Sequence, residues 1–413
     1  MEVMLERCAG LDVGKREVVA CVRTPDGAGG RRVEVRTFST FTEDLEALAA
    51  WLAENQVTAV VMEATGQYWK PIWYVLEEAG LDELKLVNAR HVKMLPGRKT
   101  DVGDAAWLAD LFEHGMLRGS FVPPAPIREL RDLTRYRKRL VQDRARETQR
   151  VARILEDAGI KLDSVASDIM GVSGRAMLDA LVAGERDPGV LAELAKGRLR
   201  SKRHELRQAL RGQFREHHAQ LIGLQLGHID HLTAAIAALD TRVDEVIDPF
   251  AAARDRLDTI PGVAKRAAEC IIAEIGTDMT VFPTPAHLAS WAGVCPGTNI
   301  TGGKRRSGHA RPGDQWLREI LIESAWAAAR SRDTYLAAQF WRLARRIGRK
   351  RAALAVSHSI LTIAWHLLAT DTVYEDLGAD WFTRHDHQRS KQRALNTLQA
   401  LGYTVTIEPA AAA

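Results

Sequence analysis

Four carboxylates in the N-terminal part of the sequence have the types and spacing of a divalent-metal site. Asp12 follows a short apolar run, Glu63 ends the apolar run VVME, and Asp101 and Asp104 stand three residues apart in KTDVGDA. At the start of a helix, residues three apart project from one face. Crowded carboxylates repel one another, and cations such as Mg²⁺, which prefer oxygen ligands, relieve this repulsion. Two ions about 3.5–4 Å apart can stabilise both the attacking and the leaving oxygen in phosphoryl transfer.

Each carboxylate also has an ordinary structural interpretation. A single Asp after a strand is often a turn or cap residue, and either Asp101 or Asp104 could be a helix N-cap. Glu63 differs, because a carboxylate that ends an apolar strand is partly buried and needs a partner. A purely binding protein with an inert metal site is a third alternative, and the intact quartet argues against it.

The segments around these residues alternate strand and helix signals. Strands are predicted at 10–14, after a short apolar run, and at 16–24 and 31–39, where apolar and polar residues alternate. They are followed by a helix at 42–55, a buried-type strand at 58–64, a helix at 68–78, a strand at 84–88 and a helix at 101–114. This order predicts an α/β fold with a mixed sheet and helices on its faces. The carboxylates then stand where an RNase-H-like sheet would need them.

The Pro-rich segment 121–126 ends this pattern, and the rest of the chain is predicted to be mainly helical. A long helix spans 127–156, further helices run from 191 to 253, and three more cover 316–330, 334–346 and 351–369. The sequence LDTIPGVAKRAAECIIAEIG resembles a helix-hairpin-helix motif. The apolar stretch 354–369 contains Ser and His and falls short of about 20 apolar residues, so it predicts a buried helix rather than a membrane span.

We therefore expect an α/β domain followed by α domains. Residues 1–125 are expected to form a catalytic domain with a mixed sheet, and residues 126–250 are expected to form a linker of long basic helices like a coiled coil. Residues 251–380 are expected to form a mainly helical domain with the helix-hairpin-helix-like motif, and residues 381–413 a tail.

The charge balance hides an uneven distribution. The chain has 57 Lys and Arg against 53 Asp and Glu, a net charge of +4, but basic residues cluster in the 127–156 helix and near residues 304–311 and 342–351. Amides after the Pro-Gly turn could also face a phosphate. The residues expected to bind nucleic acid are Arg135, Lys138, Arg139, Arg146, Gly262, Lys265, Lys304, Arg305, Arg306, Arg311, Arg345, Arg346, Arg349, Lys350 and Arg351.

The four cysteines lie far apart without a C-x-x-C pair, which argues against a disulfide framework or a zinc ribbon. The N-terminus has charges before any apolar run, so no secretory signal is predicted. We expect a cytoplasmic protein that is nucleoid-associated when it acts. His217, His218, His228 and His231 are expected to be solvated rather than metal-binding.

Motifs at both ends of the chain resemble one family. GLDVGK at 10–15, MEATGQYW at 62–69 and KTDVGDAAWLADL at 99–111 look like the DEDD signature of the insertion-sequence one-ten family of transposases, whose first domain is RuvC-like. TIPGV at 259–263, LASWAGVCPG at 288–297, GGKRRSG at 302–308 and the following WLRE resemble the C-terminal transposase domain of that family.

The resemblance implies a recombinase that cuts and rejoins donor and target DNA for a mobile element, guided by a structured non-coding RNA from the element. It also implies that Asp12, Glu63, Asp101 and Asp104 bind Mg²⁺, and that a C-terminal hydroxyl is the nucleophile that takes the DNA strand covalently. The family usually has Ser there, whereas aligning AGVCP and GGKRR places Thr301 at that position. Ser307 is the alternative nucleophile.

Sites so far apart in sequence suggest a folded-over chain or assembly in trans, and the long basic helices would suit dimerisation. We therefore expect a homo-oligomer, either a dimer or a tetramer. The alternative function is that of a RuvC-like metal-dependent DNA nuclease of the junction-resolvase type, in which the same carboxylates activate water and no covalent intermediate forms.

Overall fold

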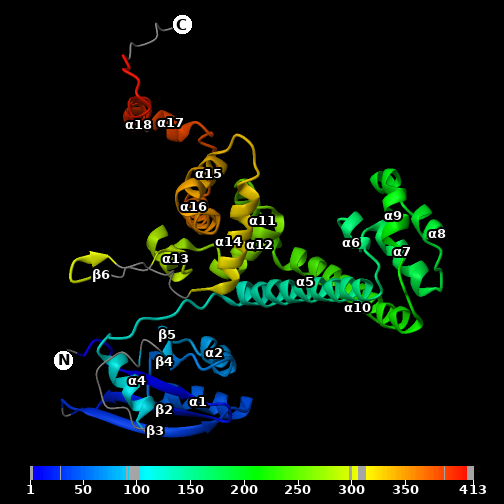
Figure 1. The fold of residues 1–413 in the computed structure, drawn as a ribbon. Helices are drawn as coiled ribbons and strands as arrows, with labels where there is room; N and C mark the ends of the chain where they lie inside the picture. Colours follow the sequence, from blue (N-terminus) through cyan, green and yellow to red (C-terminus); the bar gives the residue numbers. More distant parts are fainter. Residues whose placement is uncertain are drawn as a thin grey trace. The chain divides into compact units, whose positions relative to one another are not determined.

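The computed structural model, which describes residues 3–27, 29–89, 92, 103–296, 300–305, 313–385 and 387–406, contains two units (Figure 1). The first is Met1–Val122 and the second is Pro123–Ala413. The boundary falls inside the Pro-rich segment 121–126. The finer division of the second unit at residues 250 and 380 stays a prediction.

The first unit is built on one mixed sheet of five strands. The strands are β1 (Cys8–Val13), β2 (Glu17–Pro25), β3 (Arg31–Ser39), β4 (Ala59–Glu63) and β5 (Glu83–Val87), in the order β3-β2-β1-β4-β5. The first three strands pair antiparallel as successive hairpins, and β4 and β5 add in parallel to β1. The predicted mixed sheet of the α/β unit is confirmed.

Helices cover both faces of this sheet. Helices α1 (Thr42–Glu54) and α2 (Trp69–Glu77) pack on one face, where Leu11, Val60 and Met62 are buried against Leu48 and Leu76. Helix α4 (Asp104–Glu113) packs on the other face. The strand residues that it contacts alternate along the chain with the strand residues that face α1 and α2. Because side chains alternate between the faces of a strand, each strand contributes to both cores.

The second unit begins with two long helices that lie side by side, α5 (Ala125–Asp157) and α10 (Glu216–Val246) (Figure 1). The residues between them form a helical cap, defined here as residues 158–215. Its elements are α6 (Leu162–Val165), α7 (Val172–Val182), α8 (Pro188–Glu193), η1 (Gly197–Lys202) and α9 (Arg203–Ala209). The cap shares one core with α5 and α10, in which Met177, Leu178 and Leu206 are buried together with Leu155 and Ile222.

The C-terminal part of this unit is mainly helical, as predicted. It contains η2 (Asp248–Phe250), α11 (Ala251–Asp258), α12 (Lys265–Ile275), η3 (Met279–Val281), α13 (Pro285–Trp291), β6 (Ile300–Thr301), β7 (Lys304–Arg305), α14 (Gln315–Ala328), α15 (Tyr335–Ile347), α16 (Arg349–Thr370), α17 (Trp381–His385) and α18 (His387–Ala400). Of the described helices, α16 alone is long and apolar enough to cross a membrane. It packs against α11, α13, α14 and α15, and its Val356, Ile360 and Ala364 are fully buried, as in a core helix.

Candidate functional site

The carboxylates Asp12 and Glu63 stand at the same level on neighbouring parallel strands. The register of β1 and β4 pairs Leu11 with Met62, and Asp12 and Glu63 are the next residues of the two strands. Adjacent strands lie about 4.8 Å apart, and residues in register point to the same face of a sheet. The two carboxylates therefore project side by side from one face of the sheet, at the carboxyl end of both strands.

Helix α4 brings Asp104 to the same edge. The Cys8 thiol lies 3.8 Å from the Ala109 carbonyl oxygen, and the Met4 amide donates to the Glu113 carbonyl, so the later turns of α4 lie beside the start of β1. The helix consequently runs antiparallel to β1, and its first turn lies toward the end of the strand that carries Asp12.

The approach of α4 to β1 depends on Gly10. A Cβ atom at this position would lie 2.4 Å from the Ala109 nitrogen and 2.5 Å from the Ala105 oxygen. Gly10 and Asp12 are two residues apart, so both face α4. Val61 packs into the core beneath α4, so Glu63, two residues later, also faces the helix. Three carboxylates therefore converge on one end of one sheet face.

The described members of the quartet are suited to a cation. Asp12, Glu63 and Asp104 are each half-buried, and Oδ1 of Asp104 is shielded from solvent. Carboxylate oxygens are the ligands that Mg²⁺ and similar hard cations prefer. Asp101, the fourth predicted ligand, lies outside the described residues.

A second acidic group in this unit has a structural role. Asp110, Glu113 and His114 lie close enough to hold a metal. However, the fully buried Glu113 pairs with Arg23 and, at 2.6 Å, with Arg31, and Arg23 also lies 3.0 Å from Asp110. These ion pairs join α4 to β2 and β3. Sequence reasoning missed Glu113, which ends the apolar run AAWLADLF and so was a candidate for burial.

Thr301, the predicted nucleophile, lies in a short hairpin. Strands β6 and β7 pair Thr301 with Lys304, and Gly302 and Gly303 have φ values of 57° and 74°. Two successive residues with positive φ are the requirement of a type I′ turn, which explains the Gly-Gly pair. Arg305 lies in the same hairpin as Lys304. Ser307, Arg306 and Arg311 lie outside the described residues.

The segment that carries this hairpin is closed at its base. Gly313 lies so close to Ala292 and Gly293 that a Cβ atom there would be 2.4 Å from their backbone. The Arg318 guanidinium donates to the Gly293 carbonyl oxygen at 2.6 Å. Asp314 caps α14 by accepting the Leu317 amide at 2.8 Å. The two ends of the segment are therefore held together on the start of α14.

Two transposase family models match the chain. The model described as a transposase of the DEDD type of IS110 matches residues 9–160, and the model described as the transposase IS116/IS110/IS902 family matches residues 254–342. Together they cover more than half of the chain. The chain belongs to the IS110 family of transposases. The first match contains the carboxylate edge, and the second contains the Thr301 hairpin.

Individual proteins resemble shorter parts of the chain. A 43.6 kDa insertion element IS110 protein from Streptomyces coelicolor is 32% identical over 120 residues, an alignment that spans 29% of this chain and 29% of that protein. Two structures of RuvC from Thermus thermophilus, one of them in complex with a Holliday junction substrate, are 15% identical. Their TM-scores are 0.22 and 0.21, over 28% of this chain and 99% of theirs.

The basic residues of α5 in this transposase family member are largely neutralised inside the fold. Arg135 donates two hydrogen bonds to Glu274 of α12, at 2.8 and 2.7 Å, and a third to Asp314. Lys138 lies 2.8 Å from Glu319 of α14. Burial raises the pKa of Glu274, and its hydrogen bonds to Arg135 oppose that rise. Arg135 and Lys138 therefore join helices of the second unit.

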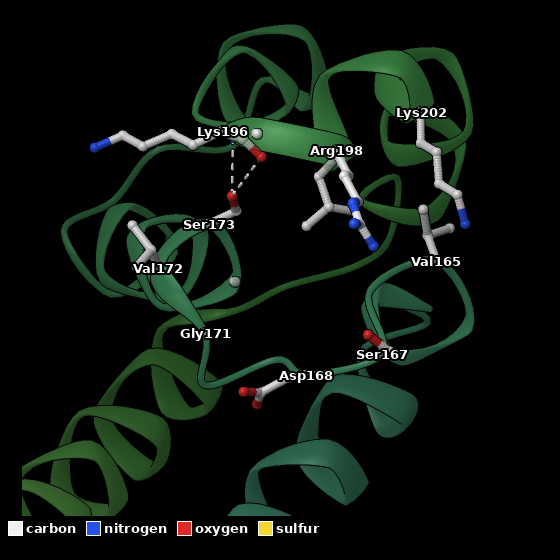
Figure 2. Close-up of a pocket in the computed structure, with 12 residues that line it drawn as sticks. Val165, Ser167, Asp168, Gly171, Val172, Ser173, Lys196, Arg198 and Lys202 are labelled. Carbon is white, nitrogen blue, oxygen red and sulfur yellow. Dashed lines mark hydrogen bonds between the residues drawn. The ribbon is translucent and has the colours of Figure 1, made fainter. Parts of the chain in front are cut away.

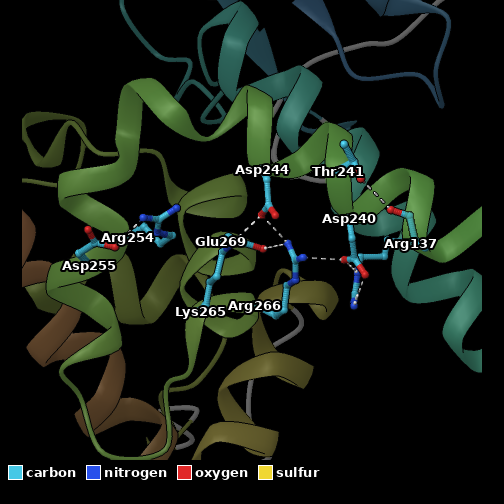
Figure 3. Close-up of polar contacts among 10 residues, drawn as sticks. Arg137, Asp240, Thr241, Asp244, Arg254, Asp255, Lys265, Arg266 and Glu269 are labelled. Atoms are coloured by element: carbon cyan, nitrogen blue, oxygen red, sulfur yellow. Dashed lines mark hydrogen bonds and ion pairs between the residues drawn. The ribbon is translucent and has the colours of Figure 1, made fainter.

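The other expected contacts on α5 and at the Pro-Gly turn also have internal partners. Arg146 pairs with Asp143, and Arg139 lies over the Trp316 ring at 5.4 Å. Lys265 pairs with Asp244 at 2.9 Å, in a network centred on Arg266 (Figure 3). A Cβ atom at Gly262 would lie 2.3 Å from the Ser324 carbonyl oxygen, so this glycine permits close packing on α14.

The basic residues around the α15–α16 junction are different. Arg345, Arg346, Arg349, Lys350 and Arg351 are all exposed, and within the residues that the structure describes they form no ion pair. Arg349, Lys350 and Arg351 occupy the first turn of α16, where the helix dipole disfavours positive charge. Helix stability therefore does not account for these three cations.

The prediction for His218 was wrong, because its side chain is buried. Its Nδ1 accepts the Arg215 amide at 3.1 Å, and its Nε2 lies 3.1 Å from an Asp157 carboxylate oxygen. Asp157, His217 and His218 lie close enough to hold a metal. However, both ring nitrogens of His218 are already occupied in joining α5 to α10.

Proposed function

We propose that the protein is a DNA transposase that breaks phosphodiester bonds and rejoins them at new positions. The observation that carries this proposal is the convergence of Asp12, Glu63 and Asp104 at one sheet edge, in a chain of a transposase family. Asp101, three residues before Asp104, would complete the group.

In this proposal the four carboxylates hold divalent cations, with Mg²⁺ favoured by the all-oxygen donor set. Bound cations would neutralise the carboxylates and stabilise charge on the phosphate oxygens. Gly10 lets α4 approach β1, and this approach positions Asp104 beside the carboxylates of the strands.

We propose Thr301 as the nucleophile, with Ser307 as the alternative. Its hydroxyl oxygen would bond to phosphorus while the bond from phosphorus to one bridging oxygen of the DNA strand breaks. The proton lost by Thr301 would balance the one that this oxygen gains as it leaves as a free hydroxyl. The energy of the broken bond is kept in a protein–DNA phosphoester, so rejoining needs no ATP. The type I′ turn supports this assignment, because it fixes the backbone next to Thr301.

The DNA and an element-encoded guide RNA would contact cations that have no ion-pair partner. Within the described residues, Arg345, Arg346, Arg349, Lys350 and Arg351 meet this condition, and Lys304 and Arg305 lie on the strand that pairs with the proposed nucleophile. The three cations at the start of α16 oppose its dipole, at a cost of about 0.3–1 kcal/mol each. Their placement supports an anionic partner.

We also propose a dimer or tetramer, in which one copy can supply the carboxylates and another the hydroxyl. Leu221 and Leu224 of α10 are 46% and 69% exposed, and they provide an apolar strip on the long helices. A strictly monomeric complex with full activity would contradict this part of the proposal.

The test uses the full chain, expressed together with the DNA that flanks its gene. We expect Asp104→Asn to lose strand exchange by at least about 100-fold while nucleic-acid binding is kept, because the cation ligands act on the chemical step. The matched control is Glu46→Gln, an exposed carboxylate on α1. Equal exchange by Asp104→Asn and the control would overturn the proposal.

A denaturing gel separates the transposase from a junction-resolving nuclease, which forms no covalent intermediate. We expect a protein-linked DNA strand with the native chain and with Thr301→Ser, and none with Thr301→Ala. An unchanged adduct in Thr301→Ala would assign the reaction to another hydroxyl, with Ser307→Ala as the next variant. Loss of exchange after RNase treatment tests the guide RNA.

A further inference from the structure

The helical cap carries a basic run that lies outside both family matches. Between residues 196 and 215 there are eight Lys and Arg residues, and Glu205 is the single acidic residue. The eight are Lys196, Arg198, Arg200, Lys202, Arg203, Arg207, Arg211 and Arg215. A local excess of this size makes one end of the second unit strongly positive.

The first four of these cations differ from their neighbours in their pairing. Lys196, Arg198, Arg200 and Lys202 are exposed, and none has an ion pair among the residues that the structure describes. By contrast, Arg203 and Arg207 pair with Glu193 at 3.1 and 3.3 Å. Among the described residues, the fold thus provides a carboxylate for Arg203 and Arg207 but not for the first four cations.

Three of these four cations line a cavity of about 630 Å³ (Figure 2). Lys196, Arg198 and Lys202 line one side, and Asp168 and the first turn of α7 line the other. Oδ1 of Asp168 accepts the Met170 amide at 2.9 Å, so this carboxylate holds its own loop. With three cations and one carboxylate, the lining has a net charge of +2 and favours an anion.

The backbone that carries the cations is fixed against α7. The hydroxyl oxygen of the buried Ser173 accepts the Lys196 amide at 2.9 Å, and the same hydroxyl lies 3.5 Å from the Lys196 carbonyl oxygen. The positive end of the α7 dipole also faces this space. An anion would therefore meet cations on a preformed support.

The spread of these cations favours a polyanion over a small anion. The 3₁₀ helix η1 has about three residues per turn, so its cations, which stand two residues apart, project in different directions. A small anion in the cavity would meet only the cations that line it, whereas a polyanion can also contact a cation that projects elsewhere from the same helix.

We propose that Lys196, Arg198 and Lys202 at the cap cavity, together with the adjacent Arg200, bind the phosphodiester backbone of a nucleic acid. This inference rests on the proposed function, because it supplies a further contact for the same partners. It assigns a binding role to a part of the chain that lies far from the carboxylates and the hydroxyl in sequence.

The test measures how nucleic-acid affinity depends on salt, using the full chain with a DNA duplex and with an RNA transcribed from the flanking DNA. The cap variant is K196Q/R198Q/K202Q. The control, R207Q/R242Q/R384Q, removes the same charge from exposed arginines that already have carboxylate partners. Thermal unfolding verifies that both variants fold.

Each lost phosphate contact reduces the slope of log K against log salt by about 0.9 for duplex DNA and about 0.7 for a single strand. For one of the two probes, we expect the slope of log K against log salt to fall in magnitude by about 2–3 in the cap variant. We also expect the affinity of the cap variant for this probe to fall at least about tenfold near 0.1 M salt. The control should keep the native slope. An unchanged slope in the cap variant, with normal binding by the native chain, would overturn this inference alone. No binding by the native chain to either probe would overturn the proposed function as well.

Discussion

Because α4 packs closely on Gly10, adding one methyl group at this position tests whether α4 positions Asp104. In Gly10→Ala, the added Cβ would lie 2.4 Å from the Ala109 nitrogen, whereas ordinary contact begins near 3.4 Å. The neighbours are backbone atoms and cannot rotate away. Helix and strand must therefore separate by about 1 Å, and overpacking of this kind costs about 1–3 kcal/mol.

The same displacement acts on the site. Asp104 immediately precedes Ala105, whose carbonyl oxygen is the second atom in conflict. A misplacement of about 1 Å can reduce a reaction rate about 100-fold. We therefore expect Gly10→Ala to lower the free energy of unfolding of the first unit by about 1–3 kcal/mol and strand exchange by about 100-fold.

Calorimetry of the full chain and the strand-exchange assay provide the two readouts. The matched control is Gly227→Ala, at an exposed position inside α10 where a Cβ atom meets nothing within 4 Å. The control should raise stability by about 0.5–1 kcal/mol, since Ala favours a helix over Gly. Native stability and exchange in Gly10→Ala would refute the proposed positioning of Asp104 by α4.

Three further predictions concern the second unit. Arg135→Ala should lower the free energy of unfolding of this unit by about 1–3 kcal/mol in denaturant titrations, because Glu274 is buried and, among the described residues, keeps only Arg131 as an ion-pair partner. Lys350→Glu should stabilise α16 by about 0.3–1 kcal/mol through the helix dipole, yet weaken nucleic-acid binding in an anisotropy assay. Burial lowers the pKa of His358 below its ordinary 6.5, so the unfolded chain binds more protons and the free energy of unfolding falls as the pH drops below 6.5. His358→Gln should remove this part of the pH dependence, and an unchanged pH profile would contradict it.

Local pattern in the sequence determined the first unit well. Alternating or continuous apolar runs predicted the five strands, and the register of β1 with β4 places Asp12 beside Glu63. The Gly-Gly pair after Thr301 likewise encodes its own turn. These features depend on neighbours in the chain or on the periodicity of one element, which a sequence displays directly.

The tertiary structure alone decided which charges remain available to a partner. Along α5 the sequence shows ten basic residues against six acidic ones, but Arg135 finds its carboxylate 139 residues away in Glu274. Arg349 and Lys196 look no more basic than Arg135 in the sequence, yet they have no ion pair within the described residues. Pairing depends on distance in space, because the energy of two charges falls with their separation and with exposure to water. The sequence therefore determined where charge is present, and the fold determined where it is left for nucleic acid.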